Sequence, residues 1–416
     1  MKHTFLKEYL TAFTLDENRD LFGDKAQETT VETIEIEGHS IPKYVNEFWT
    51  SKQRQANRIH EVAYRACFKP QLPRFFIRLF TEPKNVVYDP FSGRGTTVLE
   101  AAILNRNIIS NDINPLSKLL TRPRLFIPDR TALETRLYAI PYNEKNSAEL
   151  DLSMFYHPET ESEIVSLRVY LNERRESHRE DALDLWIRMV ATNRLTGHSS
   201  GFFSVYTLPP NQAVSQERQR KINEKRKQKP EYRDTRKLIL KKTGSLTKDM
   251  SDQTSRQLRH IGSNARFLTQ DARCTSEIQS HSVQLTVTSP PFLNVVQYAE
   301  DNWLRCWFNA IDPDEIAPKI TMSKKIEDWC DVMGQVFEEL FRITKPGGYV
   351  AFEVGEVRGG NVKLEEYVVP LGLKAGFDCE SIMINQQTFT KTANIWGISN
   401  NTKGTNTNRI VILRKD

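Results

Sequence analysis

The 416-residue sequence predicts an α/β protein with a Rossmann-like fold, built on a seven-stranded, mostly parallel sheet with a large, mainly helical insertion. A short β-branched strand, a glycine-bearing turn and a helix-forming run follow one another in "NVVYDPFSGRGTTVLEAAILNRN" (85–107). A second strand, "NIISNDINP" (107–115), ends in an acidic residue, as in Rossmann-like units. The pattern stops after residue 119 and resumes at residue 265, which predicts the insertion.

Each further element follows from local periodicity. The run "HEVAYRACFKPQLPRFFIRLF" (60–80) has apolar positions near a 3.6-residue period, which predicts a helix interrupted or restarted at its prolines. Two helical patterns in the insertion are carried by Ile164, Leu167 and Leu171, and by Leu183, Trp186, Ile187 and Val190. Five further strands are predicted in "ARFLTQDARC", "VQLTVTSPPF", "GGYVAFEVGE", "FDCESIMIN" and "NRIVILRKD".

The glycine turn and the acid after the second strand are spaced as in a nucleoside site. Asp112 lies 19 residues after Gly93, and an acid there can accept hydrogen bonds from both ribose hydroxyls. The third glycine of a dinucleotide fingerprint is replaced by Val98, which argues against a pyrophosphate cradle. A nucleoside ligand without phosphates fits better, and a purely structural strand, turn and helix stays open at this point.

Positive charge is concentrated in one segment. The net charge is +5, yet residues 217–242 hold 12 basic and 4 acidic residues, whereas the rest of the chain has 46 basic and 49 acidic residues. Such a run is usually a solvated helix face or a loop. Aromatic and hydroxyl residues just before it, in "GFFSVYTLPPN" (201–211), favour nucleic acid, because phosphates attract cations and bases stack on flat rings.

Composition excludes several classes of protein. No stretch of about 18 apolar residues and no secretory pattern is visible, so a soluble, intracellular protein without a membrane segment is expected. The five cysteines include no CxxC pair, which predicts neither a zinc site nor a disulfide framework, and no metal is expected.

Two motifs carry a resemblance to a known family. "DPFSGRGTT" (89–97) resembles the first cofactor motif of S-adenosyl-L-methionine-dependent DNA amino-methyltransferases, and "TSPPF" (288–292) resembles their catalytic motif, most closely that of the cytosine-N4 branch. The resemblance implies the methyltransferase version of the Rossmann-like fold. It divides the chain into an N-terminal extension (1–58), a first catalytic part with the cofactor motifs (59–119), the insertion (120–264) and a second catalytic part (265–416).

The resemblance also implies roles for individual residues. The expected cofactor-binding residues are Phe68, Asp89, Phe91, Gly93, Gly95, Thr96, Thr97, Asp112 and Asp271. Asp112 would take the ribose hydroxyls, Asp271 the adenine amino group, Thr96 or Thr97 would lie near the methionine carboxylate, and Phe68 would help to close the methionine side. The expected catalytic residues are Ser289, Pro290, Pro291 and Phe292.

The prolines suit this chemistry. An exocyclic amine is a poor nucleophile because its lone pair is delocalised into the ring, so two acceptors aimed at its hydrogens favour a more tetrahedral nitrogen. The Ser289 side chain and the Pro290 carbonyl would be these acceptors, held still by prolines that lack an N–H and fix φ at about −65°. Phe292 would stack on a base flipped out of the duplex.

Several alternatives stay open. Adenine-N6 methylation of DNA, methylation of RNA or tRNA, and a non-catalytic nucleic-acid scaffold compete with cytosine-N4 methylation. Carbon-5 methylation is disfavoured, because no cysteine follows a proline. The insertion either reads double-stranded DNA or forms an oligomerisation arm. In the first case phosphate contacts are expected from Arg218, Lys221, Lys225, Arg226 and Lys227.

The family resemblance further implies a restriction–modification setting. It implies a cognate restriction endonuclease as partner and a location in the cytoplasm of a prokaryotic cell, with a phage gene as the other source. It gives neither the recognition sequence nor the oligomeric state.

Overall fold

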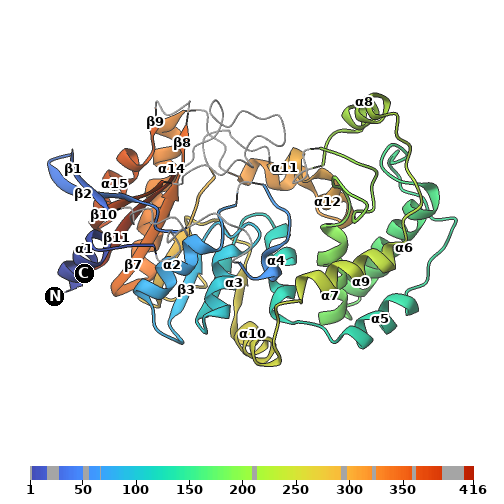
Figure 1. The fold of residues 1–416 in the computed structure, drawn as a ribbon, viewed down its shortest axis with the longest axis horizontal. Helices are drawn as coiled ribbons and strands as arrows, with labels where there is room; N and C mark the ends of the chain where they lie inside the picture. Colours follow the sequence, from blue (N-terminus) through green and yellow to red (C-terminus); the bar gives the residue numbers. More distant parts are fainter. Residues whose placement is uncertain are drawn as a thin grey trace, which may run out of the picture.

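A computed structural model describes residues 2–15, 28–49, 56–65, 67–208, 213–291, 298–320, 325–357, 362–386 and 407–416. In Figure 1 the sheet and its covering helices occupy one half of the molecule and the insertion helices the other. Phe292, the last expected catalytic residue, lies outside the described residues.

Within the described residues, nine strands form the main sheet in the order β1-β2-β10-β11-β7-β6-β3-β4-β5. They are β1 (Thr30–Ile36), β2 (His39–Asn46), β3 (Val86–Asp89), β4 (Asn107–Asn111), β5 (Arg266–Leu268), β6 (Val283–Thr288), β7 (Thr344–Val354), β10 (Asp378–Gln386) and β11 (Thr407–Arg414). β11 is antiparallel to β7 and β10, and β1 to β2, whereas the other neighbours are parallel. The seven predicted strands are confirmed as β3–β7, β10 and β11.

The predicted N-terminal extension (1–58) contributes to this sheet. Its two strands, β1 and β2, extend the sheet at one edge, where β2 pairs in parallel with β10. The buried side chain of Asn385 on β10 accepts hydrogen bonds from the backbone N–H groups of Phe48 (2.7 Å) and Trp49 (3.1 Å). The chain beyond β2 is therefore fixed to the sheet by a side chain distant in sequence.

Helices cover both faces of the sheet. One face packs against α1 (Lys2–Thr11), α2 (Gln71–Phe80), α3 (Thr96–Ile103) and α10 (Asp252–Asn264). The other face packs against α14 (Ile326–Ile343) and α15 (Glu365–Lys374). Because α10 falls within the predicted insertion range, the end of that range belongs to the covering layer of the sheet.

The insertion has its own apolar core. After α4 (Leu116–Thr121), which crosses the first boundary of the insertion, come η4 (Arg122–Leu125), α5 (Arg130–Ala139), α6 (Pro158–Glu176), α7 (Ala182–Thr192), α8 (Gln216–Arg226) and α9 (Thr235–Leu246). The two helices predicted from apolar periodicity are confirmed as α6 and α7. The same core contains Ile59, Val62 and Tyr64 from the segment before α2, and Leu304 and Phe308 from α12 (Trp303–Phe308). It is thus assembled from three separate parts of the chain.

The helix predicted over residues 60–80 is wrong in its first half. A single 3-10 turn, η3 (Arg58–His60), precedes an irregular stretch, and the α-helix begins only at Gln71. Pro70 disfavours helical conformation in the residue before it, and it stands at the N-terminal boundary of α2. The carbonyl groups of His60, Val62 and Phe68 instead accept hydrogen bonds from the Arg94 guanidinium.

The remaining elements are short. They are α11 (Tyr298–Asp301), α13 (Pro313–Ile316), η5 (Ala317–Lys319), and the hairpin of β8 (Glu356–Val357) and β9 (Val362–Lys363). Among the helices whose placement is described, none is long and apolar enough to cross a membrane.

Replacing Asn385 by leucine should lower the free energy of unfolding by about 2–4 kcal/mol, because the buried N–H groups of Phe48 and Trp49 would lose their acceptor. Urea denaturation followed by circular dichroism measures the change. Gln386→Ala, at the exposed neighbouring position, is the control and should leave stability within about 0.5 kcal/mol of the wild type. Equal stabilities for both variants would contradict the role given to Asn385.

Candidate active site

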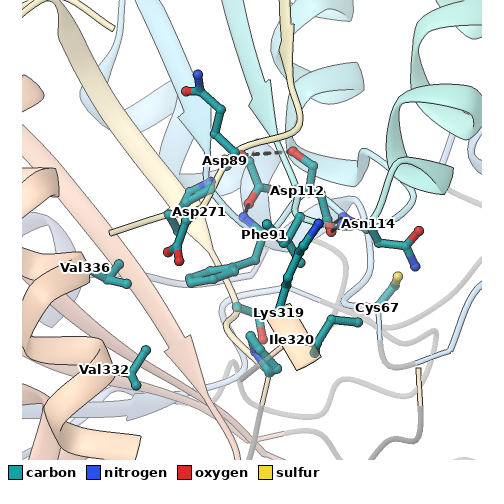
Figure 2. A pocket seen from close by; sticks show the side chains of 18 of the residues that line it. Cys67, Asp89, Phe91, Asp112, Asn114, Asp271, Lys319, Ile320, Val332 and Val336 are labelled. Carbon is teal, nitrogen blue, oxygen red and sulfur yellow. Dashed lines mark hydrogen bonds between the residues drawn. The ribbon is translucent and has the colours of Figure 1, made fainter. Parts of the chain in front are cut away.

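One pocket lies at the carboxyl ends of β3, β4 and β6, with a volume of about 910 Å³ including its open mouth. Ligands of open α/β sheets bind at this edge. In Figure 2, Asp89, Phe91, Asp112 and Asp271 gather around the hollow, with Val332 and Val336 of α14 at one side. Of the expected site residues, the lining includes Phe68, Asp89, Phe91, Gly93, Thr96, Asp112, Asp271, Ser289 and Pro291.

The glycine turn between β3 and α3 has the backbone that its sequence requires. Gly93 and Gly95 have φ values of +50° and +75°, which residues with a Cβ rarely adopt. A Cβ on Gly95 would lie 2.3 Å from Thr121 Oγ1, so this position also lacks space for a side chain. Gly93 lines the pocket and its backbone N–H donates to Asp112, whereas Gly95 is the N-cap of α3 and is not part of the pocket lining.

Asp112 directly follows β4, the second strand predicted from the sequence, and backbone groups hold its carboxylate. Its Oδ2 accepts a hydrogen bond from the Gly93 N–H (2.7 Å) and its Oδ1 accepts one from the Asn114 N–H (2.9 Å). Burial raises the pKa of Asp112 to about 6, although both hydrogen bonds favour the ionised form. The carboxylate therefore faces the pocket as an acceptor at neutral pH.

Asp89 has a different environment, although it also lines the pocket. Its Oδ1 accepts hydrogen bonds from the Thr288 hydroxyl (2.7 Å) and the Phe91 N–H (3.2 Å). Burial raises the pKa of Asp89 to about 7. Its main contact thus joins the turn after β3 to the end of β6, directly beside Ser289.

Asn111 holds the neighbouring strand ends together. Its side-chain amide donates to the carbonyls of Pro90 (3.2 Å) and Gln270 (2.9 Å) and accepts from the Gln270 N–H (3.0 Å). These bonds connect the turns after β3 and β5 to β4. Asp271, next to Gln270, lines the pocket, and the Arg273 guanidinium beside it lowers its pKa.

The two threonines at the start of α3 have different surroundings. Thr96 lines the pocket, and its hydroxyl accepts a hydrogen bond from the Arg94 Nε (3.2 Å). Thr97 is fully buried and its hydroxyl donates to the Val287 carbonyl (3.0 Å) on β6. Of the two, only Thr96 is placed to contact a ligand.

The segment Ser289–Pro291 is held on both sides. Thr288 before it is bound to Asp89, and the carbonyl of Pro291 accepts a hydrogen bond from the indole N–H of Trp329 (3.0 Å), a fully buried residue of α14. Ser289 lines the pocket, whereas Pro290 is buried and lies outside its lining. The prolines and these two anchors fix the backbone on which Ser289 is presented.

The buried carboxylate of Glu353 is hydrogen-bonded to Ser289. The Ser289 hydroxyl donates to the side chain of Glu353 on β7, and the Asn408 amide donates to its Oε1 at 3.0 Å. Burial raises the pKa of Glu353, and the two hydrogen bonds counteract this shift. Glu353 was not among the expected site residues, although an acid flanked by the apolar residues Phe352 and Val354 in "GGYVAFEVGE" could have indicated it.

Other pocket residues were also missed. Arg65, Cys67, Asn114, Lys319 and Val336 line the hollow and come from four different segments. Figure 2 shows Lys319 and Ile320, from the segment after α13, at the side of the pocket that faces Cys67 and Asn114. These residues are brought to the pocket by the fold, so no local pattern in the sequence indicates their position.

The expected DNA-contacting residues lie away from this pocket, on α8 and its C-cap. Arg218, Lys221, Lys225, Arg226 and Lys227 are all exposed. Figure 1 shows α8 at the upper edge of the insertion, on the same side of the molecule as α11.

Part of the basic segment 217–242 has a structural role instead. Arg233 donates to three backbone carbonyls, those of residues 199, 202 and 204, and Arg236 donates to the carbonyls of Leu137 and Ile140. Lys242 pairs with Glu61. Most of the remaining exposed cations of this segment lie on α8 and its C-cap, where Lys221 pairs with Glu217 and Arg220 with Asp151, and Lys229, Lys237 and Lys241 are exposed outside this helix.

In the part of the chain that the structure describes, no cluster of His, Cys, Asp or Glu could hold a metal ion. The donor groups of the pocket suit an organic ligand instead. Acceptor carboxylates, the aromatic rings of Tyr64, Phe68 and Phe91, and apolar side chains of α14 match hydroxyl groups, an amino group and an adenine ring.

Comparison with known proteins supports the same class of ligand. A family model described as DNA methylase matches residues 6–119, so the similarity begins well before residue 59. The type II methyltransferase M.MvaI of Kocuria varians is 26% identical over 118 residues, 28% of this chain and 24% of that protein. M.MjaII of Methanocaldococcus jannaschii is 29% identical over 76 residues, 18% of this chain and 14% of that protein. The chain thus matches a quarter or less of the length of these relatives.

A solved structure from Thermus thermophilus is described as a DNA modification methylase complexed with S-adenosyl-L-methionine. It is 24% identical, has a TM-score of 0.21, and the match covers 35% of this chain and 53% of that chain. The family match is consistent with S-adenosyl-L-methionine, the cofactor expected from the motifs.

Proposed function

We propose that the protein is a DNA amino-methyltransferase that transfers the methyl group of S-adenosyl-L-methionine to the N4 amino group of cytosine in a flipped-out base. One observation carries the proposal: the Asp112 and Gly93 site and Ser289 of the Ser-Pro-Pro motif line a single pocket at adjacent strand ends. The family match to DNA methylases supports the substrate class, and the Ser-Pro-Pro-Phe motif supports cytosine.

The pocket residues suit the cofactor. Asp112 accepts the ribose hydroxyls, Asp271 accepts the adenine amino group, and Phe91 with Val336 supplies the apolar surface for the ring. When bound, S-adenosyl-L-methionine supplies an electrophilic methyl group on its sulfonium. The carboxylates around the pocket also favour a ligand that carries positive charge.

Ser289 prepares the target amine. Its oxygen and the Pro290 carbonyl accept the two N–H groups, which directs the nitrogen lone pair toward the methyl group. Because the Ser289 hydroxyl proton is given to Glu353, both lone pairs of its oxygen stay available as acceptors. The nitrogen gains the methyl group and releases one proton, and Ser289 with Glu353 forms the route by which that proton leaves.

DNA would contact α8. This helix ends in Lys225, Arg226 and the C-cap Lys227, all exposed, and Arg226 stacks on Tyr206 with its guanidinium 3.7 Å from the ring centre. Exposed cations on the same side of the molecule as α11 support phosphate contacts there. The type II names of both curated relatives support a restriction–modification setting with a separate endonuclease.

The test is transfer of labelled methyl from S-adenosyl-L-methionine to duplex DNA and to RNA, followed by digestion to nucleosides and mass spectrometry. N4-methylcytosine in DNA is the expected product. N6-methyladenine would correct the base and keep the chemistry, whereas label in RNA alone would overturn the substrate class. No transfer with either polymer, together with no cofactor binding, would overturn the proposal.

Glu353→Gln should lower kcat by about 10- to 100-fold while the Kd for S-adenosyl-L-homocysteine stays within about twofold, because the amide accepts the Ser289 proton less well. Single-turnover methylation and calorimetric titration measure the two quantities. Glu366→Gln on α15, at a half-exposed ion pair, is the matched control. Unchanged kcat in Glu353→Gln would remove the residue from the mechanism.

Cofactor affinity should depend on pH through Asp112. Its pKa of about 6 means that the carboxylate is ionised above pH 6 and protonated below it, so the Kd for S-adenosyl-L-homocysteine should be constant from pH 7 to 8 and rise about tenfold per unit below pH 6. Calorimetric titration between pH 5 and 8 measures it. Asp112→Asn should bind more weakly with no change over this range. A pH dependence that survives in this variant would assign the effect elsewhere, for example to Asp89.

Replacing Lys225, Arg226 and Lys227 together by glutamine should weaken DNA binding and reduce the slope of log K against log salt by up to about 2.7, or about 0.9 for each phosphate that these side chains neutralise. Fluorescence anisotropy between 50 and 300 mM salt measures both. The control replaces the exposed Lys7, Lys84 and Lys374, which lie outside α8. Substitution is preferable to deleting residues 217–242, because Ile239 on α9 is part of the insertion core. Equal slopes for the two triple variants would contradict the role of α8.

A further inference from the structure

The pocket is connected to α8 by a continuous set of contacts through α11 and α12. Arg65, which lines the pocket, donates from Nη1 to Asp301 Oδ2 at 2.6 Å, and Asp301 ends α11. Arg305, on α12, donates to the Ala63 carbonyl (3.1 Å) and to the Asn302 side chain (2.9 Å). The segment that forms one wall of the pocket is thus bound twice to the helices that follow the Ser-Pro-Pro motif.

The same helices are bound to the chain that leads into α8. The Ala213 N–H donates to the Asp301 carbonyl (3.0 Å), and the Trp303 indole N–H donates to the Val214 carbonyl (3.2 Å). Val214 immediately precedes Ser215, the N-cap of α8. Asp301 therefore contacts Arg65 through its side chain and the start of the basic helix through its backbone.

Apolar packing reinforces this connection. Val62 and Tyr64, on either side of Ala63, share one core with Leu304 and Phe308 of α12 and with the insertion helices. A movement of the pocket wall is therefore transmitted to α12 and to the insertion, because a close-packed core does not deform continuously. The wall, α12 and the insertion behave as one packed unit.

We propose that Arg65 is a positioning residue through which cofactor binding strengthens DNA binding. This inference rests on the proposed function. The Arg65 side chain is 39% exposed and the Asp301 side chain only 6%. Without a ligand, water screens the cation side of this pair. A ligand that fills the pocket displaces that water, lowers the local dielectric and strengthens the ion pair. The bound cofactor thus favours the arrangement in which Asp301 holds the start of α8.

The reciprocal effect follows by linkage. If the cofactor raises the affinity for DNA by some factor, DNA raises the affinity for the cofactor by the same factor. Because Arg65 and Asp301 lie outside α8, the loss of either should change the coupling much more than the DNA affinity measured without cofactor. The cofactor affinity of each variant is measured separately, because Arg65 lines the pocket.

The experiment measures the Kd for fluorescent, unmethylated plasmid fragments with and without saturating S-adenosyl-L-homocysteine. The wild type should bind DNA at least about fivefold more tightly with this ligand. In Arg65→Gln and Asp301→Asn the ratio should fall to about one, with DNA affinity in the absence of ligand within about twofold of the wild type. Arg65→Lys keeps the charge and should restore most of the ratio.

Arg136→Gln is the matched control, because it also removes an arginine that pairs with aspartates, here between α5 and α7 and away from the pocket. It should keep the full ratio, and thermal unfolding of each variant identifies any that fail to fold. A wild-type ratio of one, or a full ratio in both Arg65→Gln and Asp301→Asn, would overturn the inference. Failure of the wild type to bind S-adenosyl-L-homocysteine at all would instead overturn the proposed function.

Discussion

The hydrogen bond between the Thr288 hydroxyl and the Asp89 carboxylate fixes the geometry on which the rest of the site depends. It joins the ends of two parallel strands, β6 and β3, at the point where the chain leaves each of them. One strand continues into the glycine turn and the other into Ser289. Because both groups are buried, loss of the Asp89 carboxylate would leave the Thr288 hydroxyl without its acceptor, so the two loops cannot separate without a cost. The ligand site and the Ser-Pro-Pro segment therefore keep a constant spacing.

The pocket wall before α2 is held by charge rather than by regular structure. Glu100 on α3 is fully buried between His60 (2.7 Å) and Arg74 (2.8 Å). Burial acts to raise the pKa of Glu100, but the bonds from His60 and Arg74 outweigh it and leave the pKa lowered. Arg94 then binds the intervening carbonyls. An irregular segment can line a ligand site when its backbone groups are satisfied in this way.

Much of the fold could be predicted from the sequence, because its strands are short β-branched runs that end in turn residues. The glycine turn, Asp112 and the position of Ser289 follow from local patterns for the same reason. The two strands β1 and β2 were not predicted, since their place in the sheet depends on pairing with β10 more than 300 residues away. The helix expected before Pro70 failed because tertiary contacts of Arg94 compete with helix formation. Glu353, Trp329 and Arg65 were missed because only the fold brings them to Ser289 and the pocket.

The composition of the insertion core has a consequence for the biogenesis of the protein. Leu304 and Phe308 belong to this core, although they follow the insertion by some forty residues or more. During synthesis the helices α5 to α9 therefore emerge from the ribosome with part of their apolar surface uncovered. This surface is buried only after α12, which follows the Ser-Pro-Pro motif, has been synthesised. The insertion is for this reason not an independently folding domain. If it were transferred to another protein without α12 and residues 59–64, it would expose that apolar surface and tend to aggregate.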